Sequence, residues 1–267
     1  MLIIGYILAI IMGVTLGFMG AGGSILTMPI LVYFLNVPPV IATGYSLLIV
    51  GVTALVGAIR YYRKDQINIR IALMFAVPAI IAVYTTRRFM VPAIPIEIIF
   101  YENIIITKDA FIMLFFATLM LISATIMIKN NKPKPHIVKS KIKLITYIGL
   151  EGFFVGMLTS IVGAGGGFLI IPSLVLLAGL EMKIAIGSSL LIITLNSLIG
   201  FIGDLQSGIS IDYMLLTTFL SCSIFGLIIG SKLSSRFSSE NLKKIFGYFT
   251  FAHSTMKCNY KSSGHLF

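Results

Sequence analysis

Two glycine-rich runs in this chain have residue types and a spacing that favour binding of a ligand. They read Gly20-Ala21-Gly22-Gly23-Ser24 and Gly163-Ala164-Gly165-Gly166-Gly167. A short apolar segment follows each run, over 25–36 and 168–180, and we expect both segments to be half-helices that are too short to span a membrane. Glycine permits a turn and close approach of the backbone to a ligand. The free N–H groups at a helix start suit an anion. The runs therefore predict a pocket of backbone amides for a small anion, without a metal or cofactor.

The two runs belong to an internal repeat with an offset of 143 residues. Gly20–Pro29 aligns with Gly163–Pro172, and six of these ten positions are identical. The register continues without a gap through further matched pairs, among them Gly44/Gly187, Ser46/Ser189, Leu55/Leu198 and Gly57/Gly200. Apolar composition alone does not align glycines and prolines in one register, so the sequence predicts a duplicated chain.

The glycines also have a purely structural interpretation, because small residues let membrane helices pack closely. Matching positions in two repeats favour the anion pocket over this alternative. Polar side chains in the next segment of each repeat are further candidate ligands: Ser46 in the first, and Ser188, Ser189 and Asn196 in the second. A serine can satisfy its own helix backbone. The Asn196 amide either forms an interhelical hydrogen bond or contacts the substrate.

Composition places most of the chain in lipid. Hydrophobic residues make up 58% of the sequence and charged residues 11%, whereas soluble domains carry about 25% charged residues. We therefore predict an all-α, polytopic transmembrane bundle with the lipid bilayer as its main partner. The net charge of +11 comes from Lys and Arg clustered between apolar runs. Such clusters are typical of cytoplasmic loops and do not indicate nucleic-acid binding.

The predicted organisation is a first repeat over 1–128, a basic cytoplasmic linker over 129–143, a second repeat over 144–251 and an atypical polar tail over 252–267. The tail indicates either a last helix that is truncated or frame-shifted, or a partial crossing. If each glycine run turns the chain back, the first repeat holds five segments, so the second repeat enters the membrane inverted. The charges fit this arrangement except at Arg87 and Arg88, which fall on the wrong side. If each run instead interrupts a single span, the repeats are parallel.

Two expectations concern the remaining residues. Segment 89–108 contains Pro92, Pro95 and Glu97 and predicts an external loop or surface helix. We also expect no buried Lys or Arg, so that fixed dipoles alone stabilise the anion. The sequence contains no Ser-His-Asp set and no metal-ligand cluster, which argues against an enzyme.

The paired motifs at 20–29 and 163–172, followed by Gly44-Tyr45-Ser46 and Gly187-Ser188-Ser189, resemble the TauE/SafE family of sulfite exporters. This resemblance implies a multi-pass carrier of the cell inner membrane for small sulfur-containing or organic anions such as sulfite or sulfonates. The function predicted from the sequence is secondary transport, most simply export, of such an anion. The alternative is a non-transporting membrane scaffold. The particular anion, the coupling ion and the oligomeric state, a homo-oligomer included, are left open.

Overall fold

The computed structural model describes the larger part of both repeats. The described residues are 2–20, 22–93, 97–100, 104–107, 118, 125, 141–162, 167–176, 178–206, 212–242 and 245. The predictions for segment 109–128 and for the basic linker lie mostly outside these residues, and the polar tail over 252–267 lies wholly outside them.

The described part of each repeat is built from helices in the same order. The first repeat contains α1 (Leu2–Met19), α2 (Gly22–Pro29), the π-helix η1 (Ile30–Phe34), α3 (Pro39–Tyr62), α4 (Ile69–Thr85), the π-helix η2 (Thr86–Met90) and α5 (Val91–Ala93). The second contains α7 (Lys141–Val162), α8 (Gly167–Leu176), α9 (Met182–Gln206) and α10 (Tyr213–Ser234). The segments Pro39–Tyr62, Ile69–Met90, Met182–Gln206 and Tyr213–Ser234 are long and apolar enough to cross a membrane. The predicted polytopic helical bundle is confirmed.

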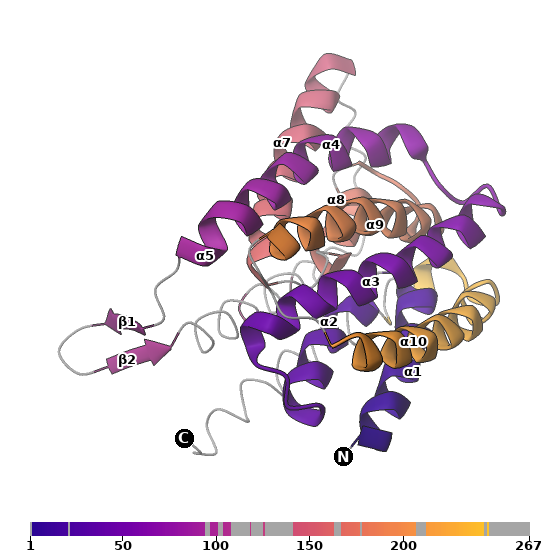
Figure 1. The fold of residues 1–267 in the computed structure, drawn as a ribbon. Coiled ribbons are helices and arrows are strands. Elements are labelled where there is room, and N and C mark those ends of the chain that lie inside the picture. The colour runs from indigo at the N-terminus through magenta and orange to yellow at the C-terminus, as the bar shows by residue number, and fades with distance from the viewer. Residues whose placement is uncertain are drawn as a thin grey trace.

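A small β-hairpin departs from the prediction for segment 89–108. Strands β1 (Glu97–Phe100) and β2 (Ile104–Thr107) pair antiparallel, with Glu97 opposite Thr107 and Phe100 opposite Ile104. Figure 1 shows this hairpin projecting from the helical bundle after α5. The β-branched run Ile104–Ile106 favours a strand, which the prediction of a loop or surface helix did not include.

The chain reverses at the first glycine run, as one of the two predicted arrangements requires. Helix α1 ends at Met19, Gly20 has a φ of +76°, and α2 begins at Gly22. The half-helix then returns along α1, because a Cβ added at Gly5 would lie 2.8 Å from Cδ2 of Leu35. A positive φ of this size suits glycine, so the break and the reversal both depend on Gly20.

The two half-helices end in the same way. Asn36 and Gly179, 143 residues apart, both have positive φ, at +52° and +67°. The N–H of Val37 donates to the carbonyl of Leu31 at 2.9 Å, and the equivalent bond joins Leu180 to Leu174 at 3.0 Å. A left-handed residue with such backbone bonds closes a helix end. Local backbone geometry therefore matches at positions that the sequence aligns.

Helices α3 and α9 cross antiparallel at the centre of the bundle. Three glycines mark the crossing: a Cβ added at Gly51 would meet Ser197 and Leu198, one at Gly57 would meet Leu190, and one at Gly200 would meet Leu47. Residue numbers thus rise along one helix as they fall along the other. Small residues allow such close contact between apolar helices.

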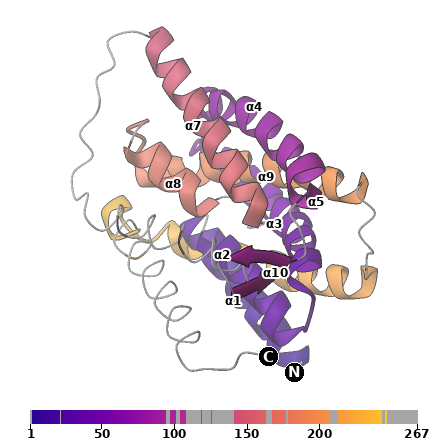
Figure 2. The same cartoon turned by 90° about the vertical axis from the view of Figure 1, so that its left-hand side faces the viewer.

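The outer helices pair across the two repeats. Helix α1 packs against α10, and α7 packs against α4 (Figures 1 and 2). Both pairs run parallel: Gly13 and Gly17 meet Ser223 and Leu227, and Gly152 and Gly156 meet Phe75 and Ala79. Among the described helices, each repeat therefore places its first helix on the last long helix of the other repeat.

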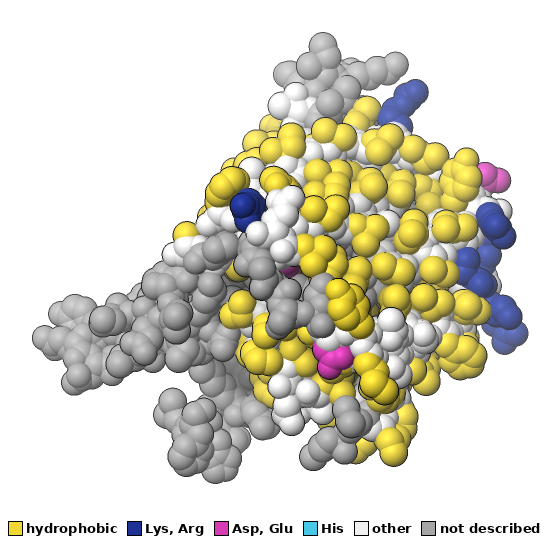
Figure 3. Space-filling model, viewed as in Figure 1, with side chains coloured by type: hydrophobic (Ala, Val, Ile, Leu, Met, Phe, Trp, Pro, Cys, Tyr) yellow, Lys and Arg dark blue, Asp and Glu magenta, His cyan; other side chains and the backbone are white. Residues whose placement is uncertain are grey.

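The surface of the bundle is mostly apolar. Figure 3 shows hydrophobic side chains over most of the visible face, with Lys and Arg gathered along the edge that carries the α3–α4 connection in Figure 1. The Tyr61 hydroxyl lies 2.9 Å from Oγ of Ser234, so the end of α10 lies at this same edge. An apolar belt bounded by basic residues on one side fits a bilayer and the positive-inside rule.

Candidate functional site

Polar side chains are buried in the central helix pair. Ser46 and Thr53 of α3 and Asn196 and Ser197 of α9 are all buried, and Ser46 Oγ, Thr53 Oγ1, Asn196 Oδ1 and Ser197 Oγ have no hydrogen-bond partner within the described ranges. Thr53 and Asn196 occupy equivalent positions of the two repeats. Polar atoms left without partners in an apolar bundle are costly. These four atoms make the central helix pair a place where a polar ligand has much to gain by binding.

The first glycine turn lies against the second repeat. A Cβ added at Gly20 would be 2.9 Å from Cγ2 of Ile186 and 3.1 Å from Oγ of Ser189. Ser189 Oγ donates to the carbonyl of Ile186 at 2.8 Å, which is the helix-satisfying bond that serines form. The structure thus brings together Gly20 and Ser189, two predicted site residues from different repeats.

The other predicted site residues are placed less completely. Gly22 and Gly23 form the first turn of α2, Ser24 is fully buried, and the buried Gly167 begins α8. Ala21 and the run Gly163–Gly166 lie outside the described residues. Helix α7 nevertheless ends at Val162 and α8 starts at Gly167. The described parts of α7 and α8 thus lie on either side of the second glycine run.

Ser188 has a defined structural contact. Its Oγ accepts the backbone N–H of Asn68 at 2.9 Å, and Asn68 also caps α4 by accepting the N–H of Ile71. The same arrangement recurs in the other repeat. The Tyr45 hydroxyl accepts the N–H of Asp212 at 2.7 Å, and Asp212 caps α10 through the N–H of Leu215. Tyr45 and Ser188 are equivalent positions, so these two contacts form a reciprocal pair.

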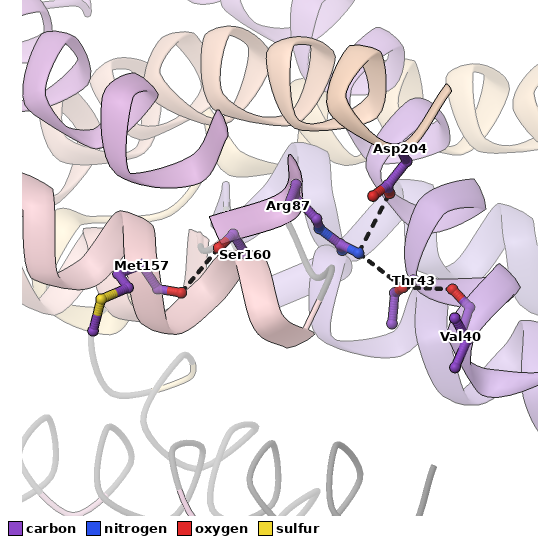
Figure 4. Close-up of polar contacts among 6 residues, drawn as sticks. All are labelled: Val40, Thr43, Arg87, Met157, Ser160 and Asp204. Atoms are coloured by element: carbon purple, nitrogen blue, oxygen red, sulfur yellow. Dashed lines mark hydrogen bonds and ion pairs between the residues drawn. The ribbon is translucent and has the colours of Figure 1, made fainter. Parts of the chain in front are cut away.

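A buried arginine corrects the expectation that no Lys or Arg lies inside the bundle. The Arg87 side chain is 1% exposed, and its Nη1 lies 3.3 Å from Oδ2 of Asp204, whose side chain is 4% exposed. Nη1 also donates to Oγ1 of Thr43 at 3.0 Å (Figure 4). The expectation was wrong because Arg87 was counted as a loop charge, whereas η2 carries it into the interface with α9.

The sequence did contain one signal for this arginine, since Arg87 was one of two basic residues on the wrong side of the predicted topology. Arg88, the other, donates to the backbone carbonyl of Gln206 at 2.9 Å. Gly203 allows η2 to pack so closely, because a Cβ added there would lie 3.3 Å from Cβ of Arg87. A basic residue that violates the positive-inside pattern is thus a candidate for a buried ion pair.

The central polar residues are closed to solvent in this conformation. Ser46, Ser189 and Asn196 are all buried. A cavity of about 470 Å³ lies at the basic end of α10, lined by Ile229, Lys232, Leu233, Ser235 and Arg236. None of these lining residues belongs to the glycine runs. Gly20 is buried as well.

The fold and the buried polar interface define a multi-pass helical membrane protein. The family model described as "Sulfite exporter TauE/SafE" matches residues 5–255. The chain therefore belongs to the TauE/SafE family, a family of membrane transporters, and the resemblance predicted from its motifs is confirmed.

Relatives similar over most of their length support this assignment. A "Probable membrane transporter protein" of Xylella fastidiosa is 28% identical, with 91% of this chain and 89% of the relative covered. "Probable membrane transporter protein YjnA" of Bacillus subtilis is 30% identical, with 90% and 92% covered. YdhB of the same organism, with the same description, is 26% identical over 87% of this chain and 90% of its own. No solved structure matches the chain.

Proposed function

We propose that this chain is a secondary transporter that exports a small sulfur-containing or organic oxyanion, such as sulfite or a sulfonate, across the cell inner membrane. The observation that carries the proposal is the broken helix at Gly20, which lies against α9 of the central helix pair, and this pair holds four buried polar atoms without a partner in the described part of the chain. Irregular backbone inside a membrane protein is tolerated where it is buried in protein or lines a substrate path. Membership of the TauE/SafE family supports the same function.

We further infer that the two repeats are inverted with respect to each other. The antiparallel crossing of the equivalent helices α3 and α9 supports this inference, as does the reciprocal pairing of α1 with α10 and of α7 with α4. Inverted repeats bring two broken helices toward one midplane site, and rocking one repeat against the other opens that site alternately to each side.

The alternative function is a non-transporting scaffold in which the glycines only allow close packing. Gly13, Gly17, Gly226 and Gly230 fit this description, because each meets the backbone of the opposing helix. Gly20 differs from them in its positive φ and in ending a helix. The unpartnered polar atoms of the central helix pair also have no use in a scaffold, so the observations favour transport.

The test is anion flux into vesicles reconstituted with the purified protein, measured with sulfite, thiosulfate, sulfate and a sulfonate. Gly20→Ala should lower flux at least tenfold, because an L-residue in a left-handed conformation costs about 1–2 kcal/mol and its Cβ would press on Ile186 and Ser189. The matched control is Gly149→Ala, since a Cβ at Gly149 would lie 3.7 Å from Pro78, in ordinary contact.

A second variant guards against misfolding of the first. Ser46→Ala removes a hydroxyl that has no hydrogen-bond partner among the described residues, so it should leave the amount of inserted protein unchanged and still reduce flux. Flux of none of the four anions by the wild-type protein, or wild-type flux by both Gly20→Ala and Ser46→Ala, would contradict the proposed function.

A further inference from the structure

Arg87 is an incompletely paired charge within an apolar helix segment. A guanidinium offers five N–H donors, yet only Nη1 has partners in the described residues, namely Asp204 and Thr43. Nε and Nη2 are buried and have no hydrogen-bond partner in the same part of the chain. A buried charge inside a membrane protein is expensive and is by default a functional group. Structural pairing with Asp204 explains one edge of the guanidinium and leaves the other unexplained.

The vacant edge has the geometry for an oxyanion. Nε and Nη2 are the two nitrogens of the guanidinium side that binds carboxylate, sulfonate or phosphate oxygens through two parallel hydrogen bonds. The ion pair with Asp204 and the hydrogen bond to Thr43 fix Nη1 and so hold the plane of the guanidinium. An arginine held in this way loses little further freedom when it binds a ligand.

Arg87 also lies close to the residues of the proposed transport path. Thr43, which accepts its hydrogen bond, is one helical turn before Ser46 on α3. Helix α7 packs against η2, the element that carries Arg87, while Figure 4 shows the guanidinium turned toward Asp204 and Thr43. The guanidinium thus lies between α3 and α9.

We propose that Arg87 is an anion-binding residue of this transporter, with its Nε–Nη2 edge taking two oxygens of the transported oxyanion while Asp204 holds Nη1 as the resting counter-ion. This inference rests on the proposed function and assigns a cationic contact to it. The ligand class is a small anion with at least two oxygens on one centre, such as a sulfonate, sulfite or carboxylate. Because Asp204 carries the same charge as the ligand, it weakens binding and so favours release.

The test is isothermal titration of the full-length protein in detergent with sulfite, thiosulfate and sulfoacetate. Arg87→Lys keeps the positive charge and an ion pair with Asp204 but loses the two-pronged edge, so it should weaken binding at least tenfold. Asp204→Asn should tighten binding by about tenfold, because it removes a like charge within several ångströms of the ligand. The matched control is Arg88→Lys, because the Arg88 side chain donates to the Gln206 carbonyl. This variant should bind the three anions like the wild type.

The outcomes separate the two proposals. Wild-type affinity in Arg87→Lys, or unchanged or weaker binding in Asp204→Asn, would overturn the role of Arg87 and leave the proposed function standing. Should the Arg87→Lys protein not fold, the tightening in Asp204→Asn alone decides, because a merely structural ion pair predicts no gain in affinity. If the wild-type protein binds none of the three anions, the proposed function and the role of Arg87 fall together.

Discussion

The two ends of the α3–α9 pair are built alike and differ in chemistry. Tyr61 near the end of α3 and Asp204 near the end of α9 stand 143 residues apart, at positions that the repeat makes equivalent. At the Tyr61 end, the hydroxyl donates to the carbonyl of Gly17 at 3.1 Å and contacts Ser234 Oγ. At the Asp204 end, the carboxylate pairs with the buried Arg87. One end is closed by neutral hydroxyls and the other by an ion pair.

Under the proposed function, this difference is where a duplicated chain would acquire a direction of transport. Two identical halves related by inversion would present the same environment to both sides of the membrane. Here the shared features lie at helix ends: the half-helix ends at Asn36 and Gly179 and the side-chain caps at Asn68 and Asp212. The side chains at the ends of the central pair carry the asymmetry, so a preference for one direction of transport would arise there.

The largest expected effect comes from breaking the ion pair. Arg87→Met leaves Asp204 as an uncompensated buried charge, which costs about 3–5 kcal/mol. The double variant Arg87→Met/Asp204→Leu removes both charges and should regain most of that loss, while still failing to bind anion. Thermal unfolding of the wild type, the single variant and the double variant in detergent checks the stability predictions. A single variant as stable as the wild type would show that the charged end is no different from the neutral one.

A smaller loss of stability, the same at both positions, is expected at the two helix caps. Asn68→Ala and Asp212→Ala each remove a side chain that accepts a backbone N–H at 3.1 Å, and loss of such a cap costs about 1 kcal/mol. Both variants should lower stability by the same amount within error, measured by the same unfolding assay. A clear loss in one and none in the other would mean that the shared features at the helix ends are not equivalent.

The smallest effect is expected at the neutral end. Tyr61→Phe removes the hydroxyl that joins α3 to α1 and α10, and one neutral hydrogen bond contributes about 0.5–1.5 kcal/mol. Flux should persist in this variant, because no charge is left unpaired. Tyr62→Phe is the control, since Tyr62 is exposed. Loss of flux in Tyr61→Phe would remove the proposed difference between the two ends.

The sequence predicted those features that local chemistry determines. The glycines at positions 20, 22 and 23 and the repeat offset of 143 predicted the turn and the half-helices, because both features depend on backbone freedom and apolar length. Local sequence could not predict the hydrogen bond from Asn68 to Ser188 or the one from Asp212 to Tyr45, because each joins residues more than a hundred positions apart. Tyr45 was accordingly absent from the predicted site.

Arg87 was missed for a related reason. Its position just after an apolar segment is typical of a loop charge, and only the packing of η2 on Gly203 and Asp204 buries it. The mismatch with the positive-inside pattern was visible in the sequence, but the partner was not, because Asp204 belongs to the other repeat. Similarly, the hairpin over Glu97–Thr107 depends on pairing between strands that polar and proline content does not reveal.

Labelling of single cysteines in intact cells tests most directly the proposed inversion on which the paired site depends. The variants Lys64→Cys and Tyr213→Cys are made in a background where Cys222 and Cys258 are replaced by serine. Lys64 lies before the start of α4. Tyr213 is the first residue of α10, and it is 73% exposed. A membrane-impermeant thiol reagent added outside should label Tyr213→Cys and should label Lys64→Cys only after the cells are opened. Equal labelling of both positions from outside would contradict the inverted arrangement.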